Sequence, residues 1–157
     1  MGEKGIADLM FIWILTILNW LFILRKRKGF NNSSNKLIKK IRLKNKLKVF
    51  LDNEIEYVFN YAAEPYIPEC FERPMHFFDI NATAVLRVLN ACQKSNIKGL
   101  LQVSSAEIYG DMKGKITEED MVVPHSTYGV SKVAADGLVQ VRWREAGVPA
   151  ISMRQFN

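Results

Sequence analysis

The segment VSSAEIYG (Val103 to Gly110) and the segment STYGVSK (Ser126 to Lys132) decide the fold that we predict for this chain. An apolar run leads into the first segment and predicts a strand over 99–104. The second segment begins a predicted helix over 126–147. A strand, a loop with polar side chains and a helix therefore follow one another in the order that is typical of α/β proteins.

The same two segments bring together three residues with a common chemistry. Tyr128 and Lys132 are four residues apart, so a helix places them on one face about one turn apart. An ammonium group beside a phenol favours the phenolate, so we expect Lys132 to lower the pKa of Tyr128 from its ordinary value of ~10. Tyr128 then becomes a general base for an alcohol proton, with the hydroxyl of Ser105 nearby.

Further elements extend this pattern into a parallel sheet. Strands are predicted over 56–62 and 149–154, and a helix is predicted over about 75–94. The strands are mostly continuous apolar runs, as expected for a parallel sheet that is covered on both faces. Ligands of such sheets bind beyond the carboxyl ends of the strands. The polar and small residues predicted at those ends are Ala62, Ala63, Ser104, Ser105 and Asn157.

Residues 47–157 resemble the middle of an extended short-chain dehydrogenase/reductase, the family of NAD-dependent nucleotide-sugar epimerases and dehydratases. The matching segments occur in the family's order: EYVFNYAAEP (56–65), INATAVLRVLNAC (80–92), VSSAEIYG, PHSTYGVSKVAAD (124–136) and MRQFN (153–157). The resemblance implies a Rossmann-like fold. We therefore predict an incomplete, doubly wound parallel sheet, a βαβαβ half, in 47–157.

The resemblance also implies catalytic roles. Ser105 would hydrogen-bond the substrate hydroxyl, and Tyr128 would remove the proton from the sugar 4-hydroxyl as hydride leaves carbon 4. Lys132 would hold the ribose of the nicotinamide. Glu107 would act as a base or positioning group, as in the family's dehydratases and decarboxylases. Ala106, however, stands where the dTDP-glucose-type dehydratases have an Asp, so the resemblance leaves epimerisation, dehydration and decarboxylation open.

Binding roles follow from the same resemblance. The implied cofactor is NAD or NADP, and the implied substrate is a nucleotide sugar. Its implied cofactor-binding residues are Ala62, Ala63, Ser104, Tyr128 and Lys132, and its implied substrate-binding residues are Ser105, Asn81 and Asn157. Asn157 matches an Asn that contacts the diphosphate. For Asn81 the alternative is that its side chain only orients the backbone.

One part of the family pattern has no counterpart in the sequence. Family members open with a Gly-x-x-Gly-x-x-Gly turn that approaches the cofactor pyrophosphate, and no such spacing occurs here. The family's C-terminal substrate region also has no counterpart before Asn157. We therefore expect a fragment with weak or no activity by itself. The alternative is a non-catalytic, membrane-tethered remnant or interaction domain that needs a partner chain, with a homo-oligomer or a complementing chain as the assembly.

The N-terminal region differs from the rest in charge and hydropathy. Residues 1–50 hold twelve Lys or Arg against two acidic residues, a net charge of +10, whereas the remainder has a net charge of −4. Residues 6–24 include sixteen uncharged residues from Leu9 to Leu24, and a basic run follows at Arg25. This pattern predicts an N-terminal apolar helix that inserts into a membrane, N-terminus out and C-terminus in, with a cytoplasmic catalytic segment.

Two alternatives remain for the apolar segment: a buried helix at a sheet edge, or the product of a truncation or frameshift. The predicted organisation is an apolar segment at 1–28 that is a candidate transmembrane helix, a basic linker or helix at 29–46 and the partial epimerase/dehydratase domain at 47–157. No aromatic platform accompanies the basic run, so we expect no nucleic-acid binding. The sequence also shows no metal-ligand spacing.

Overall fold

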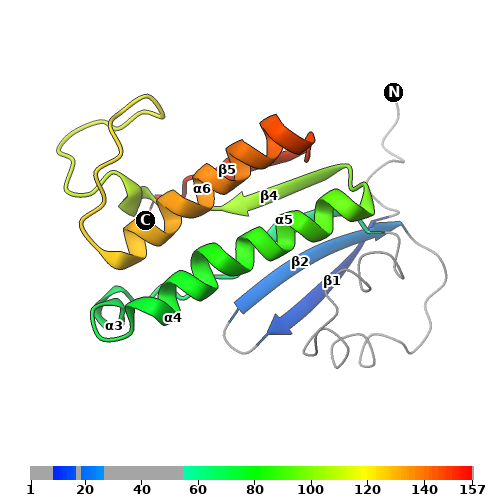
Figure 1. The fold of residues 1–157 in the computed structure, drawn as a ribbon, viewed down its shortest axis with the longest axis horizontal. Helices are drawn as coiled ribbons and strands as arrows, with labels where there is room; N and C mark the ends of the chain where they lie inside the picture. Colours follow the sequence, from blue (N-terminus) through cyan, green and yellow to red (C-terminus); the bar gives the residue numbers. More distant parts are fainter. Residues whose placement is uncertain (1–8, 17–18, 27–54, 157) are drawn as a thin grey trace.

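The computed structural model describes residues 9–16, 19–26 and 55–156. In these residues the strands form one sheet, in which the spatial order follows the chain order (Figure 1). The strands are β1 (Leu9–Thr16), β2 (Asn19–Lys26), β3 (Ile55–Asn60), β4 (Gly99–Val103) and β5 (Ala150–Met153). The sheet is mixed, because β1, β2 and β3 are antiparallel neighbours whereas β3, β4 and β5 run parallel.

The parallel part confirms the predicted βαβαβ order. Asn60 of β3 pairs with Gln102 of β4 at the carboxyl end of the register, and Val103 pairs with Met153 of β5. The helices are α3 (Ile67–Cys70), α4 (Pro74–Phe78), the π-helical η1 (Asp79–Thr83), α5 (Ala84–Ser95), the 3-10 turn η2 (Ala106–Ile108) and α6 (Thr127–Ala146). The predicted helix over 75–94 is thus a continuous run with a π-helical segment inside it.

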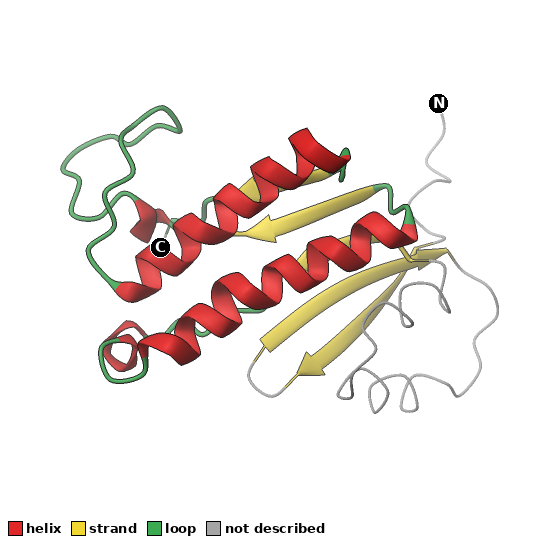
Figure 2. Cartoon of the chain, in the orientation of Figure 1, coloured by secondary structure: helices red, strands yellow, loops and turns green. Residues whose placement is uncertain are grey.

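The hydrophobic core lies between the parallel strands and two long helices. Figure 2 shows α5 and α6 side by side on one face of the sheet. Val58 and Leu100 project from neighbouring strands into a buried cluster with Leu89 of α5 and Val139 of α6. Asn96, in the left-handed region with φ of 51°, ends α5, and Gly147 does the same for α6. Both helices therefore end near the amino ends of the strands that follow them.

The predicted N-terminal apolar helix is wrong. Leu9–Thr16 and Asn19–Lys26 form the antiparallel strands β1 and β2 instead, and β2 pairs with β3. The segment is rich in Ile, Phe and Trp, which favour strands. The edge of β3 that faces away from β4 also offers backbone hydrogen-bond groups, and an added strand satisfies them. In the part of the chain that the structure describes, no helix has the length and apolarity that a membrane crossing requires.

The predicted domain limits and the membrane orientation are untested. The basic linker or helix at 29–46 lies outside the described residues. Residues 6–8 of the predicted insertion segment lie outside them as well. The predicted cytoplasmic placement of the catalytic segment therefore stays a prediction.

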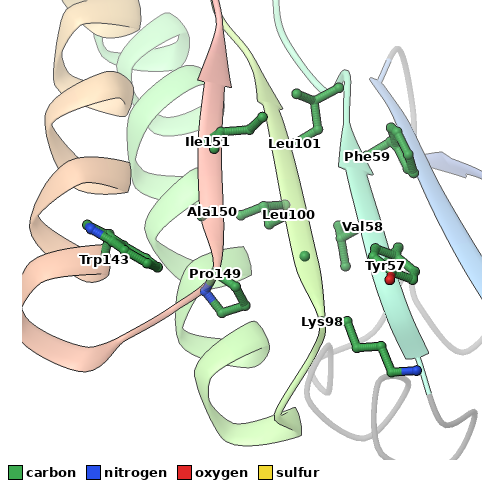
Figure 3. A pocket seen from close by; sticks show the side chains of 11 residues that line it. Tyr57, Val58, Phe59, Lys98, Leu100, Leu101, Trp143, Pro149, Ala150 and Ile151 are labelled. Carbon is green, nitrogen blue, oxygen red and sulfur yellow. The ribbon is translucent and has the colours of Figure 1, made fainter.

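The second face of the sheet differs from the expectation of full coverage. In the described residues, the helices lie on one face only, and the other holds a pocket of about 690 Å3 (Figure 3). Tyr57, Phe59, Leu101 and Ile151 line this pocket, which we call the open sheet face. Ile151 is 65% exposed there. The alternation of half-buried and exposed positions along β5 reflects this one-sided cover.

Core packing predicts the effect of truncating a helix residue. Leu89 is fully buried between α5 and the sheet, so Leu89→Ala removes apolar contacts and leaves a cavity. We expect a loss of about 2–5 kcal/mol in the free energy of unfolding, measured by urea denaturation. Val141→Ala is the control, because Val141 is 43% exposed on α6 and its truncation should cost no more than about 0.5 kcal/mol. Equal losses in the two variants would contradict this description of the core.

Candidate active site

The carboxyl end of β4 leads directly into the predicted site. Ser104 and Ser105 follow β4, and Ser105 has an extended backbone (φ −151°, ψ 152°) that caps η2. Its Oγ accepts a hydrogen bond from the backbone N–H of Glu107 over 3.2 Å. The Glu107 side chain itself is exposed. The strand end and the short turn thereby hold the Ser105 hydroxyl beside the start of α6.

The first turn of α6 lies close to η2. Ser126 caps the helix, and its Oγ accepts a hydrogen bond from the N–H of Gly129 over 3.0 Å. Gly129 is buried against the preceding turn. A Cβ at position 129 would lie 2.9 Å from both the carbonyl oxygen of Glu107 and the Cβ of Pro124. The absence of a side chain at Gly129 therefore permits the close approach of the two segments.

This approach brings Tyr128 and Ser105 together. The Ser105 hydroxyl lies close enough to the Tyr128 phenol to affect its pKa, and Tyr128 is only 7% exposed. Burial raises the pKa of Tyr128 above its ordinary value of 10, the Ser105 hydroxyl lowers it, and the Glu107 charge raises it further. The balance is a raised pKa, because removing water from a phenolate costs more than the nearby hydroxyl returns.

Lys132 lies one turn further along α6 and is 3% exposed. Its Nζ donates a hydrogen bond to the carbonyl oxygen of Val103 over 2.8 Å. Burial lowers the pKa of Lys132 to about 8, against an opposing effect from the charge of Asp136. The ammonium lies 5.9 Å from the centre of the Tyr128 ring. The expectation that Lys132 lowers the pKa of Tyr128 is therefore wrong for this structure, since burial dominates and Nζ is directed at a backbone carbonyl.

Asn81 lies within the π-helical segment η1 and is buried. Its Oδ1 accepts from the N–H of Glu64 over 2.8 Å, and its Nδ2 donates to the carbonyl oxygen of Glu64 and to Ser131 Oγ, each over 3.1 Å. Ser131 Oγ in turn donates to the carbonyl oxygen of Tyr128 over 2.6 Å. Asn81 thus joins the loop after β3 to the helix that holds Tyr128. These contacts match the alternative in which Asn81 orients the backbone.

The remaining predicted residues lie around the same edge. Ala62 and Ala63 are half-buried in the loop after β3. Ser104 is 3% exposed, and its Oγ has no hydrogen-bond partner within the described residues. Asn157 lies outside the described residues. The structure therefore gathers Ser104, Ser105, Tyr128 and Lys132 at one edge of the sheet.

Sequence reasoning missed a buried polar pair beneath this edge. Asn60 is 2% exposed and Gln102 is 1% exposed, and Asn60 Nδ2 donates to Gln102 Oε1 over 2.6 Å. Each residue is polar and lies at or next to the end of an apolar strand segment. That position was the signal available in the sequence, because a polar residue at the end of a buried strand needs a specific partner.

A second missed group lies behind Lys132. Arg154 Nε donates to Asp136 Oδ2 over 3.1 Å, and its Nη1 donates to the hydroxyl of Tyr109 and, over 3.2 Å, to the carbonyl oxygen of Glu118. Asp136 is 4% exposed and one turn beyond Lys132. Asp136 is therefore a buried carboxylate that faces cations on two sides. The spacing of Lys132 and Asp136, four residues apart on a helix, was the available signal.

Comparison with known protein families gives a match over most of the chain. The family model described as "NAD dependent epimerase/dehydratase family" matches residues 19–157. A UDP-glucose 4-epimerase from Lactobacillus helveticus is 31% identical over 111 residues, which are 70% of this chain and 34% of that protein. This chain therefore spans about a third of the length of the curated relatives that it matches.

Solved structures give a similar result. A UDP-N-acetylglucosamine 4-epimerase from Methanobrevibacter ruminantium M1, in complex with UDP-N-acetylmuramic acid, has a TM-score of 0.67 and 27% identity; the match covers 71% of this chain and 36% of that one. RMD from Pseudomonas aeruginosa, complexed with NADPH, has a TM-score of 0.64 and 28% identity, with coverage of 71% and 40%.

Two glycines of α6 provide a test of the close approach. Gly129→Ala would force the start of α6 away from η2, so we expect a loss of roughly 1–3 kcal/mol in the free energy of unfolding. Gly137→Ala is the matched control, since a Cβ there meets nothing within 4 Å. Alanine in a helix interior should stabilise that variant by about 0.5–1 kcal/mol. Thermal or urea unfolding measures both, and equal signs would contradict the packing described above.

The pKa of Lys132 predicts a dependence of stability on pH. The folded-state pKa is about 8, below the ordinary value of 10.5. At pH 7 both states are charged, and the folded protein bears the full cost of a buried ammonium. As pH rises from 8 toward 10.5, the unfolded chain binds more protons than the folded one, so the cost diminishes.

Lys132→Met removes this cost. It should raise the free energy of unfolding at pH 7 by on the order of 1–3 kcal/mol and by less at pH 9.5. Urea denaturation at the two pH values measures the difference. The control is Lys98→Met, because Lys98 is an exposed lysine paired with Glu56 and should show no such trend. A gain that grows with pH would overturn the argument.

Proposed function

Because the chain belongs to the NAD dependent epimerase/dehydratase family, we propose that Ser105, Tyr128 and Lys132 form the acid–base group of a nucleotide-sugar epimerase or dehydratase. The proposed reaction is oxidation of a nucleotide-activated sugar at carbon 4, followed by epimerisation, dehydration or decarboxylation. Relatives that include a UDP-glucose 4-epimerase and a dTDP-glucose 4,6-dehydratase support this class of substrate. As this chain stands alone, we expect the activity to be weak or absent.

The proximity of the Ser105 hydroxyl to the Tyr128 phenol is the observation on which the proposal rests. It places a hydroxyl and a phenol side by side at the carboxyl edge of a parallel sheet, where ligands of such sheets bind. A substrate alcohol that binds between the two side chains would form a hydrogen bond with Ser105. Tyr128 would then accept its proton. The raised pKa of Tyr128 implies that the deprotonated base becomes more abundant as pH increases.

The cofactor that fits this edge is NAD or NADP. Ala62 and Ala63 have small side chains, which permit the close approach of a flat ring. Ser104 Oγ is a buried hydroxyl that is unpaired within the described residues, and a buried polar atom without a partner is costly. Lys132 Nζ offers further donors for ribose hydroxyls. Such a dinucleotide, when bound, supplies the hydride acceptor that oxidation at carbon 4 requires.

Other predicted residues enter the proposal with separate roles. Glu107 is exposed at the start of η2, where its carboxylate would be free to take a proton from a neighbouring carbon in the dehydratase reaction. Asn157 would contact the substrate diphosphate. Asn81 would support the site through its hydrogen bonds to the loop after β3 and to Ser131. Ala106 stands where the dTDP-glucose-type dehydratases have an Asp, so the acid–base pair of those dehydratases is incomplete here. The epimerase reaction does not need that pair and is therefore the simpler proposal.

A second candidate function is a non-catalytic domain that binds a partner chain. The open sheet face favours it, since Ile151 is 65% exposed and lies beside Leu101 and Phe59 (Figure 3). Such an apolar surface is costly to leave in water. The partner proposed here is a polypeptide that supplies the remainder of the family domain.

Binding of the dinucleotide tests the first proposal. We expect the full chain to bind NAD or NADP in calorimetric titration, and Lys132→Ala to weaken that binding by about tenfold or more, because a buried charge-assisted donor is lost. Lys98→Ala is the matched control, because Lys98 is an exposed lysine at the opposite end of β4. It should bind as the wild type does.

Two outcomes would contradict the first proposal. Equal weakening by both lysine variants would mean that the binding is non-specific. A folded wild-type chain that binds neither dinucleotide would also contradict it, and association with a partner chain would then be the candidate function to pursue.

A further inference from the structure

Two carboxamides occupy positions where the core would otherwise be apolar. Asn60 and Gln102 face the helices in the layer next to Val58 and Leu100, each of which lies two residues earlier on its strand. Both carboxamides are almost fully buried. A pair of apolar side chains would fill this layer without polar groups to desolvate. The presence of two amides there calls for a reason other than packing.

The hydrogen bonds of the pair form a continuous chain across the edge of the sheet. Asn60 Oδ1 accepts from the backbone N–H of Ala62 over 3.2 Å, and Asn60 Nδ2 donates to Gln102 Oε1 over 2.6 Å. Gln102 Nε2 then donates to the carbonyl oxygen of Val103 over 3.0 Å. This series of hydrogen bonds ends at Lys132, whose Nζ donates to the same Val103 oxygen over 2.8 Å.

The Val103 carbonyl is thus shared by two donors of different kinds. Val103 lies one residue beyond the last pair between β3 and β4, which is Asn60 with Gln102. One carbonyl oxygen has two lone pairs and can accept from both donors. Gln102 therefore occupies one acceptor position and leaves the other to the ammonium. Its carboxamide cannot turn over without losing Asn60, because Oε1 and Nε2 would exchange roles.

We propose that Gln102, held in one orientation by Asn60, is a positioning residue that sets the place of the Lys132 ammonium and links it to the Ala62 loop. The hydrogen bonds on both sides of the pair support this assignment. The link to the Ala62 loop rests on the proposed function, in which that loop approaches the cofactor. The effect on Lys132 does not depend on the proposed function.

The surroundings of Lys132 determine what a change at Gln102 does. Tyr128 lies one turn before Lys132 on α6, Asp136 lies one turn after it, and Arg154 binds the far side of Asp136. The Val103 carbonyl is the contact from the sheet. When the Gln102 donor is removed, the second lone pair becomes available and the ammonium gains freedom to move toward water. Both effects stabilise the charged form of Lys132.

The experiment compares Gln102→Met, Asn60→Leu and the double variant in the full chain. Met and Leu match the lengths of the replaced side chains without polar atoms. Each single variant leaves one buried amide without its partner, so each should be destabilised. The double variant leaves no unpaired amide on either side chain, and its stability should recover toward that of the wild type. It restores packing but not the contact at Val103.

The first measurement is the pKa of Lys132, obtained by NMR titration of protein with 13C-labelled lysine and assigned with Lys132→Arg. In Gln102→Met and in the double variant we expect this pKa to rise from about 8 toward 10.5. Gln140→Leu, an exposed change on the same helix, is the control and should leave it unchanged. If the double variant regains stability and keeps the wild-type pKa, the pair has only a structural role and the proposal is overturned.

The second measurement is NAD and NADP affinity. The double variant should bind the preferred dinucleotide about tenfold more weakly than the wild type, despite its recovered stability. Unchanged affinity would overturn the link to the Ala62 loop. If the wild type binds neither dinucleotide, the proposed function fails, whereas the pKa of Lys132 still decides the positioning role.

Discussion

The carbonyl oxygen of Val103 joins the sheet to helix α6, because the buried ammonium of Lys132 donates to it over 2.8 Å. A charged group with 3% exposure must have such a partner. The contact requires α6 to begin beside the carboxyl end of β4, and that position in turn places Tyr128 against Ser105. Gly129 permits the approach, since any side chain there would meet the backbone of Glu107. The geometry of the candidate active site therefore depends on how one helix starts.

Polar groups are concentrated at one edge of an otherwise apolar core. Asn60 and Gln102 lie beneath the edge, Asn81 connects it to the loop after β3, and Asp136 binds Arg154 behind Lys132. Each buried group has a partner, apart from Ser104 Oγ and Asp136 Oδ1 among the described residues at this edge. A network of this kind stabilises less than apolar packing would, but it specifies one arrangement. That is the requirement of a site where a hydroxyl, a phenol and an ammonium must keep fixed places.

Much of the parallel part of the fold was predictable from local patterns. Continuous apolar runs marked β3, β4 and β5 to within two residues, and the Ser126 cap and Gly147 bounded α6. The position of Ser105 at the ligand-binding edge was predictable too, because it follows the carboxyl end of β4. The N-terminal apolar helix predicted to insert through residues 6–24 failed for a different reason. Sixteen uncharged, mostly apolar residues satisfy the hydropathy of a helix and of two strands alike, and pairing with the edge of β3 decides between them.

By itself, the sequence determined the order of strands and helices in the parallel part, the family and the identity of the hydroxyl, phenol and ammonium, because these follow from patterns and spacing along the chain. Tertiary structure alone decided the burial and the pKa of those groups. Burial raises the pKa of Tyr128 and lowers that of Lys132, although their spacing had predicted a phenolate favoured by its neighbour. The reason is physical: a pKa depends on the water that packing removes, and the residues that remove it are distant in sequence. The Val103 carbonyl likewise accepts hydrogen bonds from Gln102 and Lys132, and Asn60 binds Gln102 in turn. Only the folded sheet brings these residues together.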